Sequence, residues 1–303
     1  NRLTGHLLAC GLPGHGKSYF CRLLISLIAA RLPWVRIILY DPNQTYREMI
    51  TREPGTWLWL PWDKCRLNSL VPPKGFPYAL WGSSAIDVLT RGELAHSRYV
   101  LARAAEHLYA EAHLPEFDDG ISPVPSLFDL RDYLLSHKHS FGVKDSYIQS
   151  ALTVLSGRLD TTGKVYDCAR GMEHVLTNSR VCISTQNCSP LETYRAFING
   201  LNHYAYWQRS MEPLLDPPEL HTLIVVEESQ VLLERHGDAS VGFHLEMLLK
   251  SRPFGVGFLF IAQDISHIDT GILAGINNYF CFTQGTRGNK ELVQKMLDLS
   301  PRE

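Results

Sequence analysis

The sequence predicts an α/β protein built on a mainly parallel sheet, and two observations lead to this prediction. Short apolar runs recur along the 303-residue chain, and several are apolar on both faces, as strands covered by helices must be. Stretches with helical periodicity separate these runs, and such alternation is typical of doubly wound sheets. The expected strands are 6–10, 35–40, 56–60, 180–185, 221–226, 255–262 and 279–283. The expected helices are 17–32, 92–112, 126–136, 144–159, 190–210, 239–251 and 289–298.

One long segment breaks the alternation of strands and helices. Residues 75–178 show mostly helical periodicity with loops between, so we expect them to form a helical insertion subdomain. Residues 1–74 and 179–303 then form the α/β core. Ser126 precedes the apolar run of one helix and is expected to be its N-cap.

Composition limits the classes of function. Hydrophobic residues make up 45% of the chain and the formal net charge is −2, so any contact with a polyanion must be local. Seven cysteines without a CxxC pair fit reduced thiols better than a disulfide framework or a zinc site. The longest apolar run, 19–32, contains Arg22 and is too short to span a bilayer, so no intrinsic membrane span is expected. Because strand-like sequence begins within five residues of Asn1, we expect an excised domain.

The stretch "GLPGHGKS" follows the first expected strand and opens a helix. Gly11, Gly16, Lys17 and Ser18 satisfy the spacing of a phosphate-binding P-loop. Glycines allow successive backbone N–H groups to point at phosphate oxygens, and the helix N-terminus adds its positive dipole end. Lys17 is expected on the β- and γ-phosphates and the Ser18 hydroxyl on Mg²⁺. The expected nucleotide-binding residues are Gly11, Pro13, Gly14, His15, Gly16, Lys17, Ser18 and Tyr19.

The stretch "HTLIVVEES" ends a buried strand with two acids. In open α/β sheets, ligands lie at the carboxyl ends of the strands, so Glu227 and Glu228 are expected beside the nucleotide. One acid can hold Mg²⁺ and the next can deprotonate the attacking water. Adjacent acids favour an ATPase that activates water over a GTPase, which typically positions water with glutamine.

Two further polar residues flank the strand in "SRPFGVGFLFIAQD". Gln263 follows the strand and is expected to hydrogen-bond the attacking water or sense the γ-phosphate. Arg252 precedes it and could neutralise charge on the γ-phosphate of a neighbouring subunit, if subunits form a ring. Gln263 could instead be an ordinary polar residue at a strand end, and Arg252 could be a solvated cation.

These motifs together resemble the HerA/FtsK superfamily of ring-forming ATPases. The shared elements are "GLPGHGKS", "YDPNQTYREM", "RLNSL", "LIVVEES" and "RPFGVGFLFIAQD", and they cover nearly the whole chain. The chain is most similar to the conjugation and type IV secretion branch (VirB/TraG-like), with HerA-like translocases next. The resemblance implies a RecA-like P-loop NTPase core, with ATP and Mg²⁺ as nucleotide and metal.

The resemblance also assigns roles to individual residues. It implies phosphate and Mg²⁺ contacts for Lys17 and Ser18, the metal side for Glu227 and water activation for Glu228. It further implies γ-phosphate sensing by Gln263 and a finger role in trans for Arg252. The family usually has Asp at position 227, and it has Gly-Glu where this chain has "NQT", so no role for an acid is transferred there.

The resemblance leaves three functions open, of which the first is preferred. The first is a homo-oligomeric motor, expected to be a hexamer, that couples ATP hydrolysis to DNA translocation. The second is a secretion or conjugation ATPase with membrane-associated partners, and the third is a nucleotide-gated scaffold or switch. Arg287 and Lys290 lie in a short basic stretch that could contact DNA in a pore, or could form an ordinary solvated turn. The expected location is cytoplasmic, at most peripheral to the inner membrane.

Overall fold

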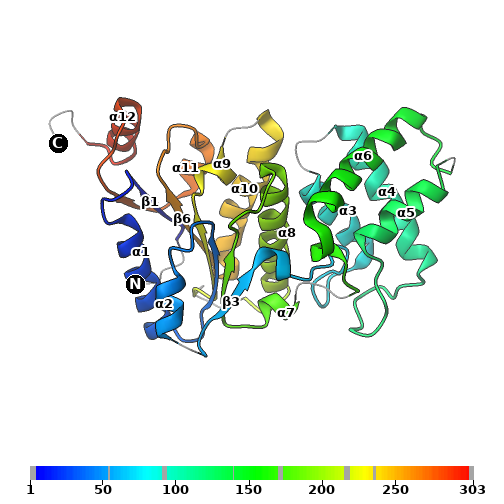
Figure 1. Cartoon of the computed structure of the whole chain (residues 1–303), viewed down its shortest axis with the longest axis horizontal. Coiled ribbons are helices and arrows are strands. Elements are labelled where there is room, and N and C mark those ends of the chain that lie inside the picture. Colours follow the sequence, from blue (N-terminus) through cyan, green and yellow to red (C-terminus); the bar gives the residue numbers. More distant parts are fainter. Residues whose placement is uncertain are drawn as a thin grey trace. The chain divides into compact units, whose positions relative to one another are not determined.

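A computed structural model describes residues 5–53, 55–90, 94–138, 140–169, 173–214, 219–234 and 237–299 (Figure 1). A seven-stranded sheet runs in the order β3-β4-β2-β5-β6-β1-β7. The strands are β1 Leu7–Cys10, β2 Arg36–Asp41, β3 Leu58–Pro61, β4 Arg180–Ser184, β5 Thr222–Glu227, β6 Val256–Ala262 and β7 Asn278–Cys281. From β4 to β7 every neighbouring pair is parallel, which confirms the predicted α/β class.

The chain divides into two compact units. Unit 1 contains residues 1–59, 178–184 and 214–303, and unit 2 contains residues 60–177 and 185–213. The helices of unit 1 are α1 Lys17–Arg31, α2 Arg47–Arg52, α9 Gln230–Leu233, α10 Gly237–Ser251, α11 Thr270–Gly275 and α12 Arg287–Met296, with the 3₁₀ turn η3 Arg252–Phe254.

The sheet of unit 1 carries helices on both faces, with α1 and α10 on opposite sides of the strands (Figure 1). On one face, Cys21, Ile25 and Ile28 of α1 pack against buried strand residues such as Leu39 and Val225. The alternate strand residues are also buried, as expected for parallel strands covered on both sides. The strand interiors are therefore fixed by packing, and polar side chains gather at the strand ends.

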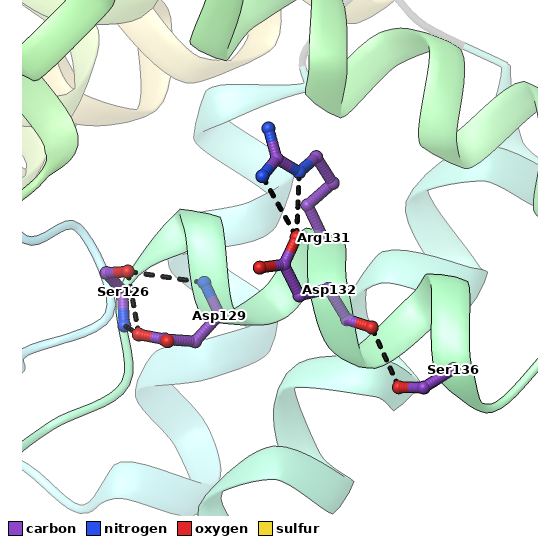
Figure 2. Close-up of polar contacts among 5 residues, drawn as sticks. All are labelled: Ser126, Asp129, Arg131, Asp132 and Ser136. Carbon is purple, nitrogen blue, oxygen red and sulfur yellow. Dashed lines mark hydrogen bonds and ion pairs between the residues drawn. The ribbon is translucent and has the colours of Figure 1, made fainter.

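Unit 2 is mostly helical within the part that the structure describes. Its helices are α3 Tyr78–Leu89, α4 Ala95–Glu111, α5 Leu127–Ser136, α6 Asp145–Thr162, α7 Glu173–Leu176 and α8 Leu191–Ser210, with 3₁₀ turns η1 Trp62–Lys64 and η2 Gly163–Tyr166. Helix α5 begins at the predicted N-cap: the Ser126 hydroxyl accepts from the Asp129 backbone N–H, and the Asp129 carboxylate accepts from the Ser126 backbone N–H (Figure 2). This reciprocal capping box satisfies two N–H groups that the first turn leaves free.

The compact units place two segments differently from the expected domain boundaries. Residues 60–74 and 185–213, expected in the core, belong to unit 2. The physical reason is aromatic packing of α8: Phe197 lies edge-on to Trp62 at a centroid distance of 6.0 Å, and Tyr204 lies edge-on to Trp81 at 5.8 Å. Helical periodicity marked α8 correctly, but it does not show which partner buries the helix.

The structure also bears on membrane insertion. None of the helices in the described ranges is both long enough and apolar enough to cross a bilayer.

Candidate active site

The predicted phosphate loop lies between β1 and α1. Gly14 has φ 78° and Gly16 has φ 84°, which are left-handed conformations that glycine adopts without a steric penalty. Gly16 is the N-cap of α1, and no side chain caps its first turn. The N–H groups at this helix N-terminus are therefore available to an anion, as the P-loop spacing predicts.

The start of the loop is held tightly by the segment after β7. A Cβ built on Gly11 would lie 2.7 Å from the Phe282 Cβ, so any larger residue would displace the chain there. The Leu12 backbone N–H donates to the Thr283 carbonyl at 2.8 Å, and the Phe282 N–H donates to the Cys10 carbonyl at 2.8 Å. The loop is thus fixed by backbone contacts at its entrance, while Gly14 and Gly16 stand clear of neighbouring atoms.

Lys17 is buried and its side chain turns back over the loop. Its Nζ donates to the Gly11 carbonyl at 2.9 Å. This hydrogen bond holds the ammonium above the loop backbone, where a lysine can contact phosphate. The neighbouring predicted residues are placed less deeply: Ser18 is partly exposed in the first turn of α1, and Pro13, Gly14, His15, Gly16 and Tyr19 are exposed. The structure brings all of these predicted residues to one edge of the sheet, because they form one continuous segment.

Glu227 ends β5 and is only 4% exposed. The Tyr46 hydroxyl donates to Glu227 Oε1 at 2.8 Å. Burial raises the pKa of Glu227 from 4.5 to about 7, and the charges of Glu228 and Asp41 act in the same direction. The Tyr46 hydrogen bond and the Lys17 charge oppose this rise. These two contacts compensate the buried negative charge only in part, and a cation beside the carboxylate would stabilise it further.

Glu228 follows directly, with φ 52°, in the left-handed region that non-glycine residues rarely occupy. This turn carries its carboxylate away from the strand direction, so Glu228 is partly exposed although Glu227 is buried. Side-chain amides of Gln263 and Gln230 donate to the two Glu228 oxygens, and the Asn43 amide donates to Oε1 at 3.3 Å. Backbone strain at functional sites often serves to aim a side chain in this way.

Three of these partners were missed by sequence reasoning. Gln230 links the group, because it donates to Glu228 and accepts from the Gln263 backbone N–H at 3.3 Å. Asn43 and Tyr46 come from the segment after β2, which lies beside β5 in the sheet. The available signal was their position just after a predicted strand, since the carboxyl ends of parallel strands meet at one edge.

Asp41, at the end of β2, organises this segment. Its two carboxylate oxygens accept from the backbone N–H groups of Thr45 and Tyr46, each at 2.9 Å. The side chain is completely buried, and burial raises the pKa of Asp41, although these backbone hydrogen bonds lower it. Asp41 thus holds the turn that presents Tyr46 to Glu227.

The donor set at this edge suits Mg²⁺. Across the described ranges, no group of three or more histidine, cysteine, aspartate or glutamate side chains could hold a metal ion alone. Mg²⁺ is usually held by one or two protein oxygens together with substrate phosphates and water. The Ser18 hydroxyl and the buried Glu227 carboxylate are hard oxygen donors of this kind, so the residues present fit the ion.

Arg252 does not join this group. It lies in η3, before the amino end of β6, whereas Gln263 follows the carboxyl end of the same strand. A seven-residue strand is roughly 20 Å long, so Arg252 lies near the opposite edge of the sheet. Its side chain is exposed, so Arg252 either is a solvated cation or acts in trans.

Arg287 and Lys290 lie in a helix rather than in a solvated turn, because α12 begins at Arg287, before the expected start at 289. They form the first turn of α12, which Thr286 caps by accepting from the Asn289 backbone N–H at 3.1 Å. Both side chains are exposed, and Arg287 Nε donates to the Glu291 carboxylate at 2.7 Å. The cap explains the difference, because the Thr286 hydroxyl satisfies an N–H group of the first turn and the helix starts although Gly288 follows.

The sheet order, the phosphate loop and the paired acids define a RecA-like P-loop NTPase fold. VirB4 of Thermoanaerobacter pseudethanolicus shares this fold with 19% sequence identity and a TM-score of 0.74, over 98% of this chain and 82% of that chain. The plasmid coupling protein TrwB in complex with ADP and Mg²⁺ shares it with 17% identity and a TM-score of 0.66, over 90% and 69%. TrwB with the non-hydrolysable ATP analogue ADPNP gives 16% identity and a TM-score of 0.67, over 91% and 70%.

TrwB is a bacterial conjugative coupling protein, of the branch that the motifs resemble. The expected fold is thereby confirmed. No protein-family model and no curated protein sequence matches this chain.

Proposed function

We propose that this chain is an ATPase that uses Mg²⁺-bound ATP and works as a ring motor of the conjugation and type IV secretion kind. The observation that carries the proposal is the convergence of the phosphate loop with Glu227, Glu228 and Gln263 at the carboxyl edge of one sheet. The fold shared with nucleotide-bound TrwB supports it.

The chemistry assigned to each residue follows from its position. The loop N–H groups and the Lys17 ammonium bind the β- and γ-phosphates. Ser18 and Glu227 would hold Mg²⁺, which when bound would supply positive charge to the phosphate oxygens. Glu228 accepts a proton from water as that water attacks the γ-phosphorus. Gln263, whose amide already contacts Glu228, orients the same water. The products are ADP and inorganic phosphate.

The amides around Glu228 also fix the direction of its carboxylate in the resting site. The Asn43 contact is the longest of the three at 3.3 Å and comes from an exposed side chain, so we expect water to replace Asn43 first. Gln263 and Gln230 then keep the carboxylate aimed while it takes the proton.

The substrate that the motor moves is a separate part of the proposal. In place of the DNA translocation preferred from the sequence, we favour transfer of protein or nucleoprotein by a homo-oligomer, expected to be a hexamer, with membrane-associated partners at the inner membrane. The fold shared with a bacterial conjugative coupling protein supports this choice. Translocation of duplex DNA is the second candidate, because the exposed Arg287 and Lys290 open α12 beyond β7, at the same sheet edge as the phosphate loop. A nucleotide-gated scaffold is the third.

Steady-state ATPase activity with and without long duplex DNA distinguishes these candidates, with Glu228→Gln as the blank. Activity that DNA leaves unchanged supports the secretion motor. Strong stimulation that weakens with salt supports the DNA motor, because phosphate contacts release counterions. Slow hydrolysis together with nucleotide-dependent binding of a partner protein supports the scaffold. Sedimentation with ADPNP measures the ring size directly.

A further inference from the structure

Two thiols face each other directly behind the phosphate loop. Strands β1 and β7 pair in parallel, with Cys10 opposite Cys281, and the two Sγ atoms lie 3.7 Å apart. Side chains of directly opposed strand residues project from the same face of a sheet, so the strand register itself brings these thiols together. Cys10 is completely buried, whereas Cys281 is partly exposed.

The two thiols have different chemical character. The Cys10 S–H donates to Cys281 Sγ, and this hydrogen bond holds the pKa of Cys281 below its ordinary value. The same bond, together with burial, raises the pKa of Cys10. Thiolates are the reactive form of cysteine, so Cys281 is the nucleophile of the pair and also the thiol that solvent reaches.

We propose that Cys10 and Cys281 form a reversible oxidation site that a hydroperoxide converts to a disulfide. The Cys281 thiolate attacks one oxygen of hydrogen peroxide, giving a sulfenic acid at Cys281 and releasing hydroxide. Cys10 then attacks the Cys281 sulfur and the S–O bond of the sulfenic acid breaks. The thiol proton of Cys10 combines with the departing hydroxide, which leaves as water. The two thiols lose two electrons and the peroxide is reduced to water. A dithiol such as dithiothreitol reverses the reaction by exchange.

The geometry makes this pair distinct from the buried cysteines of the same unit. Disulfide sulfurs lie about 2.05 Å apart, so the two Sγ atoms, now 3.7 Å apart, must approach by about 1.65 Å. Cys21 and Cys182 are completely buried, and burial raises the pKa of each thiol. These two thiols are therefore neither ionised nor open to an oxidant, which makes them internal controls.

Cross-linking this pair acts on the phosphate loop because Cys10 directly precedes Gly11. The Gln284 amide donates to the Cys10 carbonyl at 3.2 Å and lies 3.6 Å from Cys10 Sγ. Gly11 has no space to absorb a shift, since even a Cβ there would lie 2.7 Å from Phe282. Movement of Cys10 toward β7 should therefore also displace Gly11 at the start of the phosphate loop, and we expect weaker nucleotide binding. This consequence rests on the proposed function, whereas disulfide formation does not.

The test uses the whole chain, first reduced and then treated with hydrogen peroxide. After alkylation of the remaining thiols, peptide mass mapping is expected to show a linked Cys10–Cys281 peptide, which dithiothreitol removes. Binding of a fluorescent ATP analogue is expected to weaken at least fivefold in the oxidised protein and to recover after reduction. Cys281→Ser should bind the analogue equally with and without peroxide, and Cys168→Ser, which replaces another partly exposed cysteine, should respond like wild type.

Three outcomes decide the proposal. Absence of the linked peptide, or accumulation of sulfinic acid at Cys281 in its place, overturns the oxidation site. A linked peptide with unchanged affinity overturns the coupling to the loop. If the disulfide forms but neither redox state binds the analogue, the thiol site is supported and the proposed nucleotide function fails. Circular dichroism of Cys281→Ser checks that the variant is folded.

Discussion

Replacing Glu227 with glutamine is expected to stabilise the fold at pH 8. Burial raises the pKa of Glu227 from 4.5 to about 7, so between these pH values the folded protein binds more protons than the unfolded chain. Stability contributed by this group therefore falls as the pH rises through that window. Each pKa unit corresponds to about 1.4 kcal/mol, so the charged carboxylate costs roughly 3 kcal/mol at pH 8. Glutamine has the same shape and keeps an oxygen for the Tyr46 hydroxyl.

Urea denaturation of wild type and Glu227→Gln at pH 5, 6, 7 and 8, without divalent cations, measures this difference. The advantage of the variant should be small at pH 5 and should grow to its full value by pH 8. Glu228→Gln is the matched control, because Glu228 is partly exposed and its carboxylate is hydrogen-bonded by amides. An advantage that is equal at all four pH values, or a variant less stable than wild type at pH 8, would refute the reasoning.

Three other substitutions test the same site. Lys17→Ala removes the ammonium that lies over Gly11, and we expect at least a hundredfold loss of ATP affinity by calorimetry; retained affinity would exclude a phosphate contact. Tyr46→Phe removes the hydroxyl bonded to Glu227, and urea denaturation should show a loss of about 1–2 kcal/mol at pH 8, while no loss would show that the bond contributes nothing. Arg252→Ala should bind ATP normally but inhibit wild-type subunits in mixed rings, whereas additive activities would rule out a role in trans.

The local parts of the site were predictable from the sequence. The phosphate loop is one short segment, so its glycine and lysine spacing defines it without knowledge of the rest of the fold. The acids at the end of β5 were predictable for a similar reason, because an apolar run that ends in two carboxylates shows where a buried strand stops. Ser126 before an apolar run predicted the start of α5, since capping depends only on neighbouring residues.

Contacts between distant segments were not predictable from these patterns. Asn43 and Tyr46 reach the acids only because β2 lies beside β5, and alternation of strands and helices does not fix strand order. Cys10 and Cys281 meet because β7 pairs with β1, although composition alone suggested ordinary reduced thiols. Helix α8 was predicted as a helix, but its aromatic partners place it in unit 2.

Single-turnover hydrolysis by Glu228→Gln, with ATP affinity measured on the same protein, tests the central claim most directly. We expect ATP affinity within about threefold of wild type and a hydrolysis rate at least a hundredfold lower, because a general base typically contributes 10²–10⁴-fold. Hydrolysis at the wild-type rate would remove Glu228 from the mechanism and contradict the assignment of this sheet edge as an ATPase site.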